Sequence, residues 1–152
     1  MPQPLITTAR TPRHGLPYLF AGQAQKEAFV NEALARLDAL VQLTVIGERG
    51  DPPADPAPGD CYIVSADPAG AWLGEARAVA TWAESQWLFA HAAAGMRAFD
   101  LESGCLAVFD PATGWRRVTA PAAASGGAVQ DSEVRAALAA VLDGLRVMGI
   151  FA

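Results

Sequence analysis

The sequence is poor in the residues from which catalytic and metal sites are built. Its 152 residues include two histidines, His14 and His91, and two cysteines, Cys61 and Cys105. Their spacing matches no zinc-binding pattern, and no nucleophile-elbow, HExxH, P-loop or dinucleotide-binding pattern occurs. The carboxylates lie at predicted turns, where Asp and Glu are common for local reasons. We therefore expect no catalytic residues, no cofactor and no metal, and the chain is predicted not to be an enzyme.

Charge is scarce as well, and its balance is acidic. Charged residues make up 18% of the chain, with a formal net charge of −5. Because nucleic-acid phosphates require a basic surface, we expect no nucleic-acid partner. The sequence also lacks the apolar run of about 20 residues that crosses a membrane. Its start, MPQPLITTARTPRHG, has no apolar core of signal-peptide length, so neither membrane insertion nor secretory export is predicted.

Two cysteines are too few for a disulfide framework. Each lies in an apolar, strand-like run, so Cys61 and Cys105 are expected to be small buried hydrophobic residues. One disulfide between them is the alternative. Hydrophobic residues make up 52% of the chain, which is enough for a core without cross-links.

The clearest structural signal is the segment 21–43, AGQAQKEAFVNEALARLDALVQL, which predicts one long amphipathic helix. Its spacing places four apolar residues on a single face, which we expect in the core: Val30, Leu34, Leu37 and Val41. Residues 1–20 are rich in proline and are predicted to form an arm. The arm's apolar side chains either cover the chain's own core or dock on a neighbouring subunit.

After a proline-rich loop at 50–59, the pattern becomes that of β-strands. Strands are predicted at residues 61–66, 77–82, 86–91, 96–101, 105–110 and 114–118. Because the connections are too short for parallel crossovers, an antiparallel meander is expected. The predicted fold class is therefore α+β, with a long N-terminal amphipathic helix packed on a small antiparallel β-meander over residues 21–118.

The C-terminal part predicts a linker and an assembly helix. Residues 119–130 have the composition of a flexible linker, and residues 131–152 predict a helix capped by Asp131 or Ser132 and ended by Gly149. Its spacing places five apolar residues on one face, which we expect to form an oligomer seam: Val134, Leu138, Val141, Leu145 and Met148. Since so short a helix is marginal alone in water, this seam must be buried in its own domain or against copies of itself.

The tryptophans in the predicted sheet suggest a second possible function, the binding of sugars. They are Trp72, Trp82, Trp87 and Trp115. Exposed indole faces stack on sugars, whereas buried indoles fill a core. Trp82 with Trp87, and Phe109 with Trp115, also flank turns and are expected to form cross-strand pairs. Glycan binding, with capsule polysaccharide as the first ligand, is therefore an alternative function.

Several segments together resemble one protein family. TPRHGLPYLFAGQAQKEAFVNEALARLDALVQ is followed by GDCYIV, by AWLG and by two tryptophans in W-x4-W spacing. Over about residues 11–118, these segments resemble the domain of unknown function found in tail-fibre and spike proteins of phages and gene transfer agents. The C-terminal DSEVRAALAAVLDGLRVMGIFA is similar to the ends of related phage structural proteins.

The resemblance implies a structural role. The short chain, without fibre repeats or a large receptor-binding region, is most similar to the head-spike base proteins of gene transfer agents. Such a subunit acts as a spike base or fibre adaptor at a capsid vertex, or as a tail-fibre component. The implied partners are copies of itself in a pentamer, the capsid protein, a spike-fibre protein and host-surface polysaccharide. The implied location is the surface of a phage-like particle assembled in the bacterial cytoplasm, and the family supplies no catalytic residues.

Overall fold

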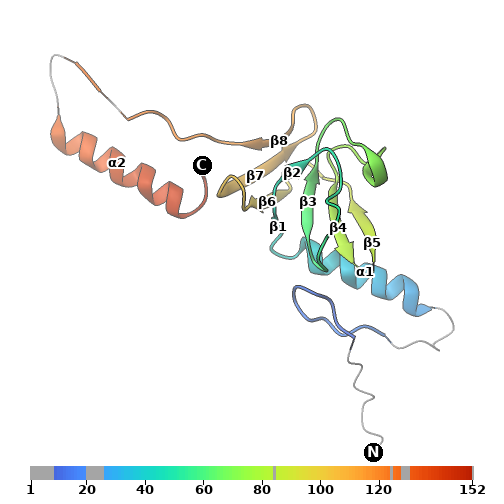
Figure 1. The fold of residues 1–152 in the computed structure, drawn as a ribbon. Coiled ribbons are helices and arrows are strands. Elements are labelled where there is room, and N and C mark those ends of the chain that lie inside the picture. The colour runs from blue at the N-terminus through green and yellow to red at the C-terminus, as the bar shows by residue number, and fades with distance from the viewer. Residues whose placement is uncertain (1–8, 20–25, 84, 124, 128–130, 152) are drawn as a thin grey trace, which may run out of the picture. The chain divides into compact units, whose positions relative to one another are not determined.

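The computed structural model describes residues 9–19, 26–83, 85–123, 125–127 and 131–151. It divides the chain into two compact units, Met1–Ala92 and Ala93–Ala152. Figure 1 draws the helices and strands, which are α1 (Lys26–Leu40), β1 (Thr44–Val45), β2 (Glu48–Arg49), β3 (Cys61–Val64), the 3-10 helix η1 (Gly70–Trp72), β4 (Val79–Ala83), β5 (Gln86–Ala90), β6 (Arg97–Asp100), β7 (Cys105–Asp110), β8 (Gly114–Arg117) and α2 (Ser132–Val147).

The fold is predominantly β, so the predicted architecture of a long N-terminal helix on one antiparallel meander is wrong. The strands form two sheets of four strands each. Helix α1 has 15 residues, and the chain turns away after it at Gln42, whose φ is 49°. Strand β2 pairs in parallel with β3, because the proline-rich loop between them carries the chain back to start in the same direction. Strands of two residues have no readable period, which is why β2 was not predicted.

The sheet of the first unit has the order β2-β3-β4-β5. Strand β4 pairs antiparallel with both β3 and β5, and every residue of β3 is buried. One core cluster lies on this sheet and contains Tyr62, Val64, Trp72 and Ala80, with Trp87 and Phe89 packed against it. The strands predicted at residues 61–66, 77–82 and 86–91 are confirmed.

Helix α1 lies across the end of this sheet, where β4 turns into β5 (Figure 1). There it joins a second core cluster, formed by Tyr18, Ala35, Ala83 and Leu88. Leu34 is partly buried and packs against this cluster. The middle of the helix therefore packs on the sheet through Leu34 and Ala35. The small side chain of Ala35 allows a close approach.

The apolar face predicted for α1, which carries Val30, Leu34, Leu37 and Val41, is not the buried face of the helix. Val30, Leu37 and Val41 are 40–51% exposed. The buried positions are instead Ala35, Asp38 and Ala39, which also recur at helical spacing. Two alanines and a hydrogen-bonded carboxylate therefore occupy the buried positions that the larger apolar residues were expected to fill.

Asp38 on this buried face ties the arm to the helix. Its carboxylate accepts hydrogen bonds from the Thr11 hydroxyl (2.6 Å) and from the backbone N–H groups of Arg13 (2.8 Å) and His14 (2.6 Å). Burial alone raises the pKa of Asp38, but these bonds, together with the charge of His14, outweigh burial and hold its pKa below the usual value. An ionised Asp38 therefore organises the turn at residues 11–15.

The same arm covers the C-terminal end of α1. The Arg13 guanidinium donates to the carbonyl oxygen of Ala39 (2.6 Å), and His14 Nε2 lies 3.0 Å from that of Val41. These donors satisfy carbonyls left unpaired at the end of the helix, and the cationic Arg13 also complements the helix dipole. With Tyr18 buried in the adjacent cluster, residues 9–19 dock on their own unit. Residues 1–8 of the predicted arm lie outside the described residues.

The second unit combines antiparallel strands with α2. Strand β7 pairs antiparallel with β6 and with β8, as predicted for these segments. Asp131 caps α2, because its carboxylate accepts the N–H groups of Glu133 and Val134. The helix is followed by Gly149, whose φ is 68°. The predicted helix, its cap and its terminating glycine are therefore confirmed.

Both cysteines are free and buried, as predicted. Cys61 Sγ lies 3.3 Å from the Thr81 hydroxyl, and burial raises the pKa of the Cys61 thiol. A protonated, buried thiol is a packing group, so the disulfide alternative is wrong.

Candidate functional site

The carboxylates at turns are occupied by local structure. Buried Asp100 pairs with Arg117, with 2.5 Å between Oδ2 and the guanidinium. Asp110 accepts the N–H groups of Ala112 and Thr113, which lowers the pKa of Asp110. Within the described ranges, His, Cys, Asp and Glu side chains nowhere gather in a group of three or more that could hold a metal ion.

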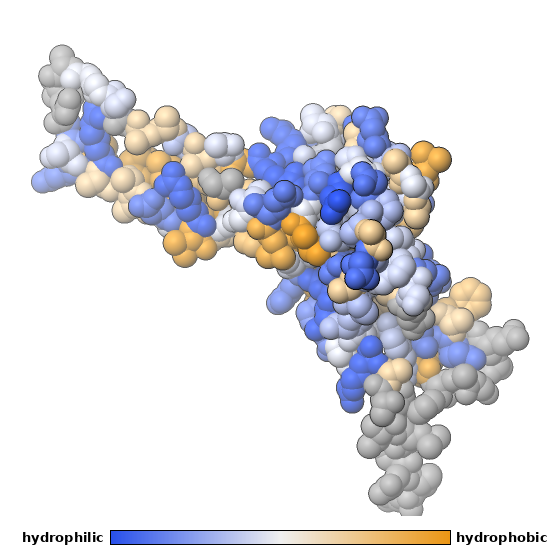
Figure 2. Space-filling model, in the orientation of Figure 1, coloured by the Kyte–Doolittle hydropathy of each residue, from blue (hydrophilic) through white to orange (hydrophobic). Residues whose placement is uncertain are grey.

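The strongest candidate for a functional surface is the oligomer seam predicted in the C-terminal helix, which we now call the α2 seam. Four of its residues, Val134, Leu138, Val141 and Met148, are 46–64% exposed, and Leu145 is half-buried. Figure 2 shows apolar side chains along the part of the surface that α2 forms. An apolar stripe of this length on a helix is normally covered. Of the helices that the structure describes, none is both long and apolar enough to cross a membrane.

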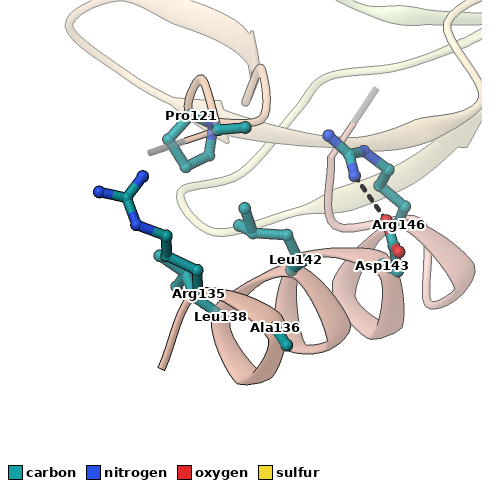
Figure 3. Close-up of a pocket in the computed structure, with 9 residues that line it drawn as sticks. Pro121, Arg135, Ala136, Leu138, Leu142, Asp143 and Arg146 are labelled. Carbon is teal, nitrogen blue, oxygen red and sulfur yellow. Dashed lines mark hydrogen bonds and ion pairs between the residues drawn. The ribbon is translucent and has the colours of Figure 1, made fainter. Parts of the chain in front are cut away.

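The side of α2 that carries Leu142, together with Leu138 of the seam, lies toward the chain's own linker. A pocket of about 370 Å³ separates them and is lined by Pro121, Ala123, Arg135, Ala136, Leu138, Ala139, Leu142, Asp143 and Arg146. Figure 3 shows Pro121 opposite Leu142, with Arg135 toward one end and Arg146 toward the other. Leu142 is buried there. Because Leu142 follows Val141 by one residue, it points about 100° away from it. Val134, Val141 and Met148 therefore stay exposed, although Leu138 of the seam lines the pocket.

The residues after α2 dock on the sheet of the same unit. We call residues 149–151 the tail. The Leu106 N–H donates to the Gly149 carbonyl oxygen (2.6 Å), and Phe151 forms a parallel bridge with Val118. An added Cβ at Gly149 would lie 2.6 Å from Cε2 of Phe99. The tail is therefore a short strand addition that requires glycine at its first position.

Replacing Gly149 with alanine is expected to release the tail. A side chain at this φ costs roughly 1–2 kcal/mol, and the Cβ would also collide with the Phe99 ring. Gly144→Ala is the matched control: its Cβ meets nothing within 4 Å, so it should stabilise α2 by up to about 1 kcal/mol. The rate of hydrogen exchange at the Leu106 amide, measured in each variant, reports whether the tail stays docked. Exchange as slow in Gly149→Ala as in the wild type would contradict the docked tail.

The tryptophans divide into one core residue and two hairpin pairs. Trp72 is fully buried, so it presents no face to a sugar. Trp82 pairs across β4 and β5 with Trp87, with ring centroids 5.1 Å apart, and Phe109 pairs with Trp115 at 5.4 Å. The predicted cross-strand pairs are confirmed. Trp82, Trp87 and Trp115 are half-buried.

Two features of the α2 region were not predicted. These are the burial of Leu142 on the side of α2 that faces the linker pocket and the docking of the tail. Gly149 followed by Ile150 and Phe151 is a turn residue followed by strand-forming residues, which is a signal for a short strand. Its partners, Leu106 and Val118, are remote in sequence, so no local pattern identifies them.

Comparison with known proteins assigns the chain to a protein family. The profile of the family described as "Protein of unknown function (DUF2793)" matches residues 30–116, which is more than half of the chain. The match includes most of α1 and all of β1 to β7, whereas α2 and the tail lie outside it. No curated protein and no solved structure matches the chain. The expected domain-of-unknown-function family is confirmed, and the chain belongs to the DUF2793 family.

Proposed function

We propose that the chain is a structural subunit of a phage-like particle, a gene transfer agent, in which it acts as spike base or fibre adaptor at a capsid vertex. The observation that carries this proposal is the exposed α2 seam. A subunit that works by assembly keeps apolar residues for its neighbours. The resemblance to phage spike and tail-fibre proteins supports the same role.

The proposed partners are other copies of the chain, the capsid protein and a spike-fibre protein. Copies meet through the α2 seam, and a ring repeats one contact until it closes. The five-fold order of the ring rests on the resemblance alone. Helix α1 offers a second apolar surface, since Phe29 is 80% exposed beside Val30 and Leu37.

The seam is tested by charge insertion. Val134→Glu with Val141→Glu is expected to abolish self-association, because burying the new carboxylates carries a large desolvation cost. The matched control is Ala140→Glu with Val147→Glu, which has the same spacing and charge on another face of α2, where both residues are exposed. Light scattering after size exclusion measures mass, and circular dichroism confirms that each variant is folded.

The expected result is a folded monomer for the seam variant and wild-type mass for the control. Equal masses for both variants would overturn the role of the seam. Proteomics of purified particles tests the location independently, and absence of the chain from the particles would overturn the proposed function.

Glycan binding is the second candidate function, favoured by the partly exposed indoles of Trp82, Trp87 and Trp115. Binding to capsule polysaccharide on a glycan array, lost in Trp82→Ala, would support it. No binding to any glycan would remove it.

A further inference from the structure

We infer that the open face of strands β6 to β8 is a docking site for an acidic segment of a partner protein. Two arginines, Arg97 and Arg116, bind carboxylates of that segment, and an apolar side chain between the carboxylates enters a hollow beside Val108. The site is separate from the α2 seam. It therefore goes beyond the proposed function and does not depend on self-association.

The register of the strands places these three residues in one row. Arg97 of β6 lies opposite Val108 of β7, and Val108 lies opposite Arg116 of β8. Side chains of directly opposed residues lie on the same face of a sheet. Because neighbouring strands are about 4.8 Å apart, the Cα atoms of the two arginines are separated by roughly 10 Å, with the valine midway between them.

The row belongs to the open face of the second unit. Arg97 and Arg116 are exposed, and Val108 is 37% exposed. The residues that alternate with them along the strands belong to the other face, where Ala98 and Ala107 are buried. A sheet with one buried and one open face leaves the open face available to a partner.

The tail and a turn bound this face without covering the row. Gly149 of the tail lies against Phe99, which forms the next row together with Leu106. At the other end, Asp110 accepts two backbone N–H groups of the turn between β7 and β8. The arginine row lies between these two ends of the face.

Both arginines of the row are available to an anion. Neither makes a hydrogen bond or an ion pair with any described residue, whereas Arg117, on the other face, pairs with Asp100. Asp110 attracts Arg116 by its charge, but its hydrogen bonds go to the turn. In a chain of net charge −5, two such cations in one row make this patch complementary to an acidic partner.

An apolar hollow lies beside the row. Its volume is about 490 Å³, and its lining includes Val108, Pro111, Arg116 and Val118. This volume lies within the range of about 300–1,000 Å³ that is usual for binding sites. An apolar lining next to free guanidinium groups fits a segment that carries an apolar side chain between carboxylates.

The chemistry of the hollow favours a protein segment over a sugar. A sugar stacks on an exposed aromatic face. The rings of Phe109 and Trp115 pair with each other, and alternation along the strands places both on the face opposite to Val108 and Arg116. This aromatic pair therefore gives no stacking surface beside the arginines, and the surface there is apolar and cationic.

A labelled helical peptide of Ala, Leu and Glu tests the site by fluorescence anisotropy. Two Glu residues placed seven positions apart are separated by about 10.5 Å along a helix, which matches the arginines, and Leu residues lie between them on the same face. The chain is expected to bind this peptide. Arg97→Gln with Arg116→Gln should weaken binding about tenfold.

The matched control is Arg36→Gln with Arg146→Gln. It removes the same charge from two exposed ion pairs on the helices, those with Glu32 and Asp143, and it should bind the peptide as the wild type does. Circular dichroism checks that both double variants are folded. Absence of peptide binding by the wild type, or an equal loss in the two double variants, would overturn the inference.

Changes in the probe test the same site without altering the protein. A peptide with Gln in place of Glu, and one with Ala in place of Leu, should each bind more weakly. If the peptide without Leu bound equally well, the hollow would have no role and the inference would fail. Polygalacturonate at the same carboxylate concentration should leave the peptide bound. Displacement by this polymer would identify a site for carboxylated sugars instead and would overturn the protein partner.

Discussion

Asp38→Ala is expected to lower the free energy of unfolding by about 3–5 kcal/mol. The substitution leaves three donors without their acceptor, among them the Thr11 hydroxyl and the Arg13 N–H. Urea denaturation at neutral pH measures the loss. Glu32→Ala is the matched control, because Glu32 pairs with Arg36 on the surface (2.7 Å) and such pairs contribute at most about 1 kcal/mol. Equal losses in the two variants would contradict this role of Asp38.

The same carboxylate predicts how stability depends on pH. Burial opposes ionisation, but the bonds from Thr11, Arg13 and His14 prevail and hold the pKa of Asp38 below its ordinary value. Its stabilising contribution is therefore complete above the unfolded pKa of about 3.9 and is lost as pH falls through the folded pKa. Asp38→Asn should show a shallower acid loss than the wild type. Parallel curves for the two proteins would contradict the assignment.

Trp72→Ala is expected to cost about 3–5 kcal/mol, as for other large aromatic residues removed from a core. Trp72 is fully buried and packs edge-to-face on Trp87, with ring centroids 5.0 Å apart, and at 5.8 Å from Tyr62. Its Nε1 has no hydrogen-bond partner among the described residues. Trp72→Phe should therefore cost much less, since it keeps an aromatic ring and removes a buried unpaired donor.

Thermal unfolding of the two variants checks this order. Trp82→Ala is the control within the same sheet, and its half-buried indole should cost less than that of Trp72. A Trp72→Ala protein with wild-type stability would show that this indole is not a core residue. It would also reopen a ligand-binding role for Trp72.

These expectations connect the core to the proposed role in assembly. Asp38 and Trp72 stabilise the first unit, whereas the α2 seam and the tail belong to the second unit. A variant of the seam can therefore lose assembly without losing the fold of the first unit. The family match covers most of α1 and β1 to β7 but not α2, so assembly through α2 is proposed for this chain and not for its whole family.

The sequence by itself determined the elements whose signals are local. The strands at 61–64, 79–83 and 86–90, both aromatic hairpin pairs and the capped helix α2 all follow from patterns within a few residues. Alternation, turn residues and a capping carboxylate act on neighbouring backbone. No distant partner is needed to recognise them.

The tertiary structure decided which surfaces those elements bury. Spacing alone favoured Val30 and Leu37 for the core, but the approach of the arm selected Asp38, which is satisfied by donors from residues 11–14. Likewise, the parallel pairing of β2 and the docking of the tail join segments that are remote along the chain. Which face is buried and which segments pair depend on the donors and side chains that the folded chain brings together. Periodicity within a single segment carries no information about contacts with segments that are remote in sequence.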